Sequence, residues 1–168
     1  MSLGRYGPRH ERGSGHIAHR REAGTALEGA ARPAIYVLDT NALSALMKGS
    51  AAVVERLATT APADIAIPQP VIAEIAFGIE RLPRSKRRAA LQARFDFISA
   101  ELPRAEWTDA VSRMFGRIKA TRERRGTRIE DCDAAIAAHA LALDATLVTA
   151  NLGHMIRVPG LRVEDWSR

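Results

Sequence analysis

The chain has 168 residues, of which 46% are hydrophobic and 26% charged, which is enough for one domain with a buried core. Its single cysteine excludes an internal disulfide framework or a cysteine-based zinc finger, and it fits a reducing cytoplasm, where we expect the protein to be located. No apolar stretch approaches the length of a membrane span, so no membrane partner is expected. The net charge of +6 is compatible with a nucleic-acid partner but does not demonstrate one.

The first 32 residues differ in composition from the rest. They hold six arginines, three glutamates and half of the glycines, without apolar periodicity. We therefore predict a flexible N-terminal extension over residues 1–32 and one folded domain over residues 33–168. The histidines of the extension could bind a metal, although the composition favours a solvated segment.

From residue 33 onward, short β-type runs alternate with helical patterns. The predicted strands are 35–38, 65–67, 105–107, 146–149 and 161–163. The predicted helices are 41–48, 51–59, 70–82, 84–102, 109–125 and 131–144. This alternation predicts an α/β fold whose mostly parallel sheet of four to five strands is covered by helices on both sides.

Three acidic residues interrupt otherwise apolar patterns. Asp39 directly follows the first predicted strand, at the carboxyl end where sites form in open α/β sheets. Glu74 shares a helical face with Val71 and Gly78, although a structural ion pair with an arginine would also account for it. Asp133 lies in the first turn of its helix on the inward face, where helix capping is the simpler explanation, but Asp131 can already supply that cap.

These acids can converge although they are far apart in the sequence. The strands that end at Asp39 and Thr149 would place their carboxyl ends together in a parallel sheet, and Asn151 follows closely. Ligands that are all oxygen atoms suit Mg²⁺ or Mn²⁺ better than Zn²⁺. The usual chemistry of such a site is hydrolysis of a phosphodiester bond.

A basic cluster opens the helix predicted over residues 84–102. Arg84, Lys86, Arg87 and Arg88 oppose the dipole at a helix N-terminus. A solvated surface explains this cluster, and contact with phosphate or with an acidic partner is the alternative.

Five segments in order carry a resemblance to a known family: 36–44 (YVLDTNALS), 72–83 (IAEIAFGIERLP), 133–138 (DAAIAA), 147–151 (LVTAN) and 159–163 (PGLRV). Over about residues 34–166 the chain resembles PIN-domain ribonucleases, and more narrowly the VapC-type toxins of bacterial toxin–antitoxin pairs. The resemblance implies a three-layer α/β/α, Rossmann-like fold.

The resemblance also implies roles for individual residues. It makes Asp39, Glu74 and Asp133 the metal-binding acids, and places Asn151 at a fourth position where many relatives have aspartate. Three further residues would support the site: Thr40 and Asn41 by shaping it, and Thr149 by orienting Asp39 through a hydrogen bond. Two departures from the family pattern are His154, where aspartate is common, and Ala150, where arginine is frequent.

The resemblance implies an endoribonuclease toxin that depends on Mg²⁺ or Mn²⁺, acts on RNA, is neutralised by a cognate antitoxin protein and forms a homodimer. We expect the dimer to pack in part through helices 70–82 and 84–102, because an apolar stripe follows the second helix. The stripe consists of Leu91, Phe95, Ile98 and Leu102. The alternatives are an RNA-binding PIN module with weak or no catalysis, and a DNA nuclease of the related flap-nuclease type.

Overall fold

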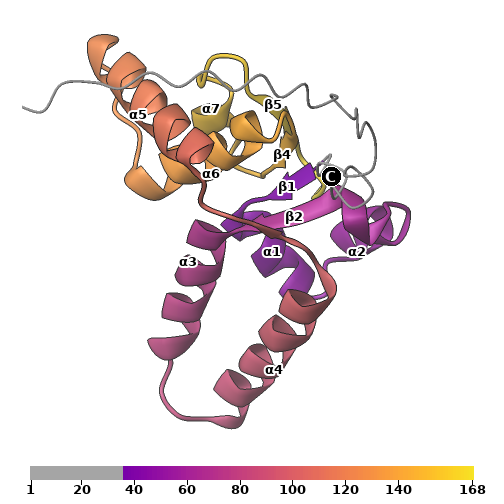
Figure 1. The fold of residues 1–168 in the computed structure, drawn as a ribbon. Coiled ribbons are helices and arrows are strands. Elements are labelled where there is room, and N and C mark those ends of the chain that lie inside the picture. Colours follow the sequence, from indigo (N-terminus) through magenta and orange to yellow (C-terminus); the bar gives the residue numbers. More distant parts are fainter. Residues whose placement is uncertain (1–35) are drawn as a thin grey trace, which may run out of the picture. The chain divides into compact units, whose positions relative to one another are not determined.

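A computed structural model describes residues 36–168, so the extension predicted over residues 1–32 lies outside the described residues (Figure 1). In this described part of the chain, five parallel strands form one sheet in the order β3-β2-β1-β4-β5. The strands are β1 (Tyr36–Leu38), β2 (Ile65–Pro68), β3 (Arg104–Ala105), β4 (Thr146–Val148) and β5 (Arg162–Glu164). The predicted parallel sheet is therefore confirmed, with its longest strand only four residues long.

Within residues 36–168, seven α-helices connect these strands. They are α1 (Thr40–Met47), α2 (Ala51–Ala58), α3 (Gln69–Glu80), α4 (Lys86–Glu101), α5 (Asp109–Arg124), α6 (Asp131–Ala142) and α7 (Leu152–Met155). In Figure 1, α1 to α4 lie on one side of the sheet and α5 to α7 on the other, which gives the predicted three layers. The sequence prediction missed α7 and a 3₁₀ turn over Pro62–Asp64, because such short helices carry no periodic signal.

The two central strands define the place where a site can form. From β1 the chain moves to β2 on one side, whereas β4 pairs with β1 on the other side. The order of connections thus reverses between β1 and β4, and such a switch point opens a crevice at the carboxyl ends of the strands. Val37, Leu38, Leu147 and Val148 are all buried, as expected for strands covered on both faces.

The helices α3 and α4 form a hairpin that extends beyond the sheet (Figure 1). The apolar stripe predicted on α4 is packed inside the domain rather than left over for a partner. Phe95 and Leu102 are buried, and Leu91 and Ile98 pack against the core. The large apolar side chains exposed on this hairpin are instead Phe77 and Phe97.

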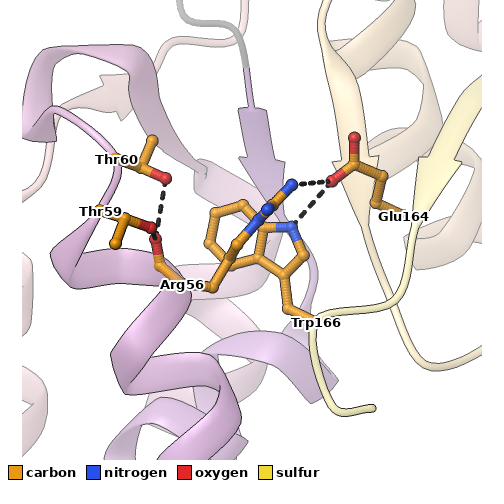
Figure 2. Close-up of polar contacts among 5 residues, drawn as sticks. All are labelled: Arg56, Thr59, Thr60, Glu164 and Trp166. Carbon is orange, nitrogen blue, oxygen red and sulfur yellow. Dashed lines mark hydrogen bonds and ion pairs between the residues drawn. The ribbon is translucent and has the colours of Figure 1, made fainter.

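The end of β5 and the residues after it contact α2, on the side of the sheet that α1 to α4 cover. Figure 2 shows Arg56 lying over the indole ring of Trp166, with 5.8 Å between the guanidinium carbon and the ring centroid. Glu164 accepts hydrogen bonds from Arg56 at 3.2 Å and from the Trp166 indole nitrogen at 3.0 Å. Trp166 is buried and meets Tyr36 edge-on, so the end of the described chain is part of the core.

Within residues 36–168, no helix is long and apolar enough to cross a membrane.

Candidate active site at the carboxyl edge of the sheet

Asp39 is the most deeply placed acid of the predicted site. It follows β1 directly, is only 3% exposed, and caps α1 by accepting a hydrogen bond from the Ala42 amide at 2.6 Å. Burial raises its pKa, and the charge of Asp133 raises it further. Hydrogen bonds from the Thr149 side chain and from the amides of Ala42 and Asn41 lower it. The structure therefore brings Thr149 to Asp39 as the resemblance implied.

Glu74 differs from the sequence prediction in its exposure. Periodicity placed it on the inward face of its helix, but its side chain is exposed at the edge of that face. Glu74 lies at the opening of a groove lined by residues of α1, α3 and α4, so one side of its side chain faces solvent. Glu74 is nevertheless held in place, because its carboxylate accepts a hydrogen bond from the Thr40 hydroxyl and another from the Cys132 thiol. Burial, helped by this contact, raises the pKa of Cys132 to about 12.

Asp133 lies in the first turn of α6 and is half-buried. Burial is the main cause that raises its pKa, and the charges of Glu74 and Glu130 add to it, whereas His154 acts in the opposite direction. The capping role predicted for Asp131 is wrong. Glu130 occupies the cap position, and Asp131 instead forms an ion pair with Lys119.

Thr149 and Asn151 continue from β4 beside these acids. The backbone amide of Asn151 donates a hydrogen bond to the Thr149 hydroxyl oxygen at 2.9 Å. Because this hydroxyl also bonds to the Asp39 carboxylate, it connects the backbone at Asn151 with Asp39. In the described part of the chain, the side chain of Asn151 makes no hydrogen bond that would place it among the acids. Asn41 is exposed, and it contributes its backbone amide rather than its side chain.

Two neighbours of the site were not assigned from the sequence. Cys132 contacts Glu74, and His154 on α7 lies close enough to Asp133 to stabilise its charge. Cys132 could have been identified from its position next to Asp133. The position of His154 depends on α7, which the sequence did not reveal.

Across residues 36–168, no group of three or more His, Cys, Asp or Glu side chains is gathered closely enough to hold a metal ion. The chemistry of the donors still fits a divalent cation. The charge of Asp133 raises the pKa of Asp39, and the charge of Glu74 raises the pKa of Asp133. Asp133 therefore repels both of the other acids. A cation bound among them would remove this repulsion, and carboxylate oxygens are the ligands that Mg²⁺ and Mn²⁺ prefer.

The carboxyl edge of the sheet thus combines a buried acid at the switch point with two further acids. The family model of the PIN domain matches residues 36–161. The chain therefore belongs to the PIN-domain family.

Two relatives specify the branch of this family. The chain is 32% identical over 136 residues to ribonuclease VapC2 of Rickettsia felis, a match that covers 80% of this chain and 99% of the relative. It is 28% identical over 131 residues to the tRNA(fMet)-specific endonuclease VapC of Salmonella typhimurium, covering 78% of this chain and 97% of the relative. The family branch is thus that of the VapC-type PIN toxins.

Solved structures agree with this placement. The chain resembles a chain of VapBC2 from Rickettsia felis bound to a promoter DNA fragment, with a TM-score of 0.71 and 29% identity. That match covers 78% of this chain and 98% of the other. DNA-bound VapBC from Salmonella typhimurium gives a TM-score of 0.70 and 28% identity, covering 79% and 98%.

Proposed function

We propose that this protein is an endoribonuclease toxin that depends on Mg²⁺ or Mn²⁺ and is neutralised by a cognate antitoxin protein. The observation that carries the proposal is the buried carboxylate of Asp39 at the carboxyl end of β1, coupled electrostatically to Asp133 at the start of α6. The names of the relatives, which are ribonucleases and a tRNA-specific endonuclease, support RNA as the substrate.

Each site residue has a role that follows from its surroundings. Asp39, Glu74 and Asp133 would hold the cation, and Asn151 would contribute its amide oxygen. Thr149 orients Asp39, and Thr40 orients Glu74, each through a hydrogen bond to the carboxylate. A bound divalent cation supplies the Lewis acidity that activates water and stabilises the charge developing on the scissile phosphate. Because Asp39 and Asp133 are held by strand β1 and helix α6, the acids are positioned by rigid elements.

An antitoxin segment would reach this site along a neighbouring groove. A groove of about 270 Å³ begins at Thr40 and Glu74 and continues between α1, α3 and α4 to Leu82 and Leu91. Its lining is mainly apolar beyond Glu74, so it suits an apolar segment whose end approaches the acids. An arginine of the antitoxin that reaches the carboxylates would be a natural contact.

A homodimer is the second assembly that we propose. Because the predicted apolar stripe on α4 is packed inside the domain, the contact between the two subunits would use other residues of the α3–α4 hairpin. Phe97 is 68% exposed, and it lies with Leu46 and Ala93 beside a separate depression of about 400 Å³ between α1 and α4. Light scattering at micromolar concentration tests the dimer, which a monomeric mass would disprove.

A cleavage assay with purified protein and RNA tests the enzymatic function. Wild type is expected to cleave with Mg²⁺ or Mn²⁺ and to stop when EDTA is added. Asp39→Asn and Asp133→Asn should lower the rate by roughly 10²-fold or more, the scale on which loss of one electrostatic stabiliser acts. Asp131→Asn is the matched control, because Asp131 is exposed and paired with Lys119, and it should cleave like wild type.

Two outcomes would contradict the proposal. If folded Asp39→Asn cleaves at the wild-type rate, the acid is not part of the active site. If wild type binds RNA without metal-dependent cleavage, the chain is an RNA-binding PIN module instead.

A further inference from the structure

The far end of the α3–α4 hairpin carries a cluster of cations that its own helix does not explain. Lys86, Arg87 and Arg88 fill the first turn of α4, which contains no acid, so they oppose the helix dipole. Arg88 is compensated by an ion pair with Glu80 at 2.6 Å. Arg84, Lys86 and Arg87 are exposed and have no acidic partner within residues 36–168.

An exposed aromatic ring lies between this cluster and the acidic site. Phe77 is 63% exposed, a large fraction for an aromatic side chain. It follows Glu74 by three residues and precedes Arg81 by four, so the three side chains form one line along α3. The guanidinium of Arg81 lies over the ring of Phe77, 5.4 Å from its centroid.

This line is distinct from the groove assigned to the antitoxin. The groove uses the side of α3 that bears Gly78, Ile79 and Leu82, whereas Phe77 and Arg81 are not part of its lining. Glu74 lies at the border between the two surfaces. From Glu74 to Arg81 the helix rises by about 10 Å, a distance that a short stretch of extended nucleic acid can span.

We propose that the exposed side of α3, from Phe77 to Arg81, and the basic cluster of Arg84, Lys86 and Arg87 bind single-stranded RNA that leads into the acidic site. The inference rests on the proposed ribonuclease function. Phe77 offers a stacking surface for a base, and the cations bind phosphates of the backbone. This combination is typical of surfaces that bind single strands without reading their sequence.

A protein partner fits this surface less well. In a symmetric homodimer, the same patch faces itself or a neighbouring patch of the second copy, which would bring uncompensated cations together. An RNA strand supplies a negative charge at each nucleotide and can neutralise several cations of the cluster at once. Charge complementarity therefore selects RNA.

Binding of a fluorescently labelled, unstructured RNA oligonucleotide to the full-length protein tests the inference. The measurement is made by anisotropy in EDTA, which prevents metal-dependent cleavage, over a series of salt concentrations. The triple variant Arg84→Gln/Lys86→Gln/Arg87→Gln should bind roughly tenfold more weakly, and its slope of log affinity against log salt should fall by about 2. A control triple variant, Arg113→Gln/Arg117→Gln/Arg124→Gln on α5, removes the same charge from a different surface and should have a smaller effect.

The aromatic part of the surface has its own variants. Phe77→Ala should weaken RNA binding about tenfold, which is within the range for loss of one stacked base. Val54→Ala, at an exposed apolar side chain of α2 away from the hairpin, should bind RNA like wild type. Phe77→Trp should restore the affinity and add a tryptophan fluorescence signal that RNA quenches.

The outcomes separate this inference from the proposed function. Equal losses of RNA affinity in the two triple variants would show an effect of net charge alone and would overturn the inference. The inference would also be overturned if Phe77→Ala binds RNA like wild type but changes the mass of the protein assembly in solution, because Phe77 would then belong to a protein contact. If these variants bind normally while Asp39→Asn abolishes cleavage, the inference fails and the ribonuclease function stands. If RNA binding falls as expected but no metal-dependent cleavage is found, the surface is confirmed and the enzymatic proposal fails.

Discussion

Thr40 and Glu74 are joined by a hydrogen bond in which the Thr40 hydroxyl donates to the Glu74 carboxylate. The bond connects the first residue of α1 with the middle of α3, so it spans two sides of the proposed site. Glu74 is exposed, and an exposed glutamate without such a partner samples many rotamers. Thr40 thus determines where one of the three proposed metal ligands is held.

Replacing Thr40 tests this positioning role. Thr40→Val keeps the shape of the side chain but cannot donate to Glu74, and a hydrogen bond to a charged group contributes about 1.5–3 kcal/mol. We expect the Mg²⁺ concentration for half-maximal RNA cleavage to rise roughly tenfold, with a smaller change in the rate at saturating Mg²⁺. Thr40→Ser keeps the hydroxyl and should titrate like wild type. An unchanged Mg²⁺ titration for Thr40→Val would show that Glu74 is not a ligand.

Asp39 should make the protein without metal less stable as the pH rises. Its pKa is raised in the folded protein, mainly by burial, so the folded state loses its proton with more difficulty than the unfolded state. The resulting cost sets in as the pH passes the ordinary pKa of aspartate and is complete above the raised value. Asp39→Asn can still accept the Ala42 hydrogen bond but carries no charge. In EDTA, it should unfold at a higher denaturant concentration than wild type at pH 7, and at a similar one near pH 3.

Added Mg²⁺ supplies the control for this stability effect. Wild type should gain stability from Mg²⁺ because the ion binds the folded state, whereas Asp39→Asn should gain much less. If the variant is less stable than wild type in EDTA at pH 7, the hydrogen bonds of Asp39 outweigh its desolvation and the reasoning is wrong.

Asn151 determines how strongly the site attracts a cation. Its side chain is free of hydrogen bonds among residues 36–168, and its amide oxygen is a weaker ligand than a carboxylate. Asn151→Asp should therefore lower the Mg²⁺ concentration needed for half-maximal cleavage, and Asn151→Ala should raise it. If both variants titrate like wild type, Asn151 lies outside the coordination sphere.

His139 should make the fold sensitive to acid. The ring is fully buried on α6, its Nδ1 lies 2.8 Å from the Ala135 carbonyl oxygen, and its Nε2 has no partner in the described structure. Burial lowers its pKa, so the unfolded chain takes up a proton that the folded protein does not. The free energy of unfolding should fall as the pH drops below the ordinary value near 6.5, by up to about 1.4 kcal/mol per pH unit.

Urea unfolding at several pH values checks this dependence. His139→Met has no group that titrates in this range, so its stability should depend less on pH between 7 and 5 than that of wild type. A pH dependence that survives in His139→Met would assign the acid sensitivity to other groups.

The sequence predicts those features that depend on local patterns. The runs around Val37 and Leu147 predict buried strands because β-branched and aliphatic residues are continuous there, and Asp39 is placed correctly because it directly follows such a run. Fold and central acid could therefore be inferred before the structure was known.

Features that depend on neighbouring elements could not be predicted in this way. The exposure of Glu74 depends on how closely α1 and α4 pack against its side of α3, whereas periodicity gives only the angle of a side chain around its helix. Arg122 illustrates the same limit, since it lies in the last turn of α5, next to exposed cations, and is nevertheless buried. The proximity of His154 to Asp133 requires the position of α7, a helix of four residues.

The pairing of β1 with β4 affects the order in which the protein becomes active during synthesis. The ribosome makes Asp39 well before Val148 and Thr149. The Asp39 amide nevertheless bonds to the carbonyl of Val148, and the Asp39 side chain accepts a hydrogen bond from Thr149. Strands that pair across such a long stretch come together late in folding. Chains truncated after residue 145 should accordingly neither cleave RNA nor arrest growth. A nascent toxin of this topology therefore stays inactive until synthesis has passed Thr149, long after Asp39 has been made.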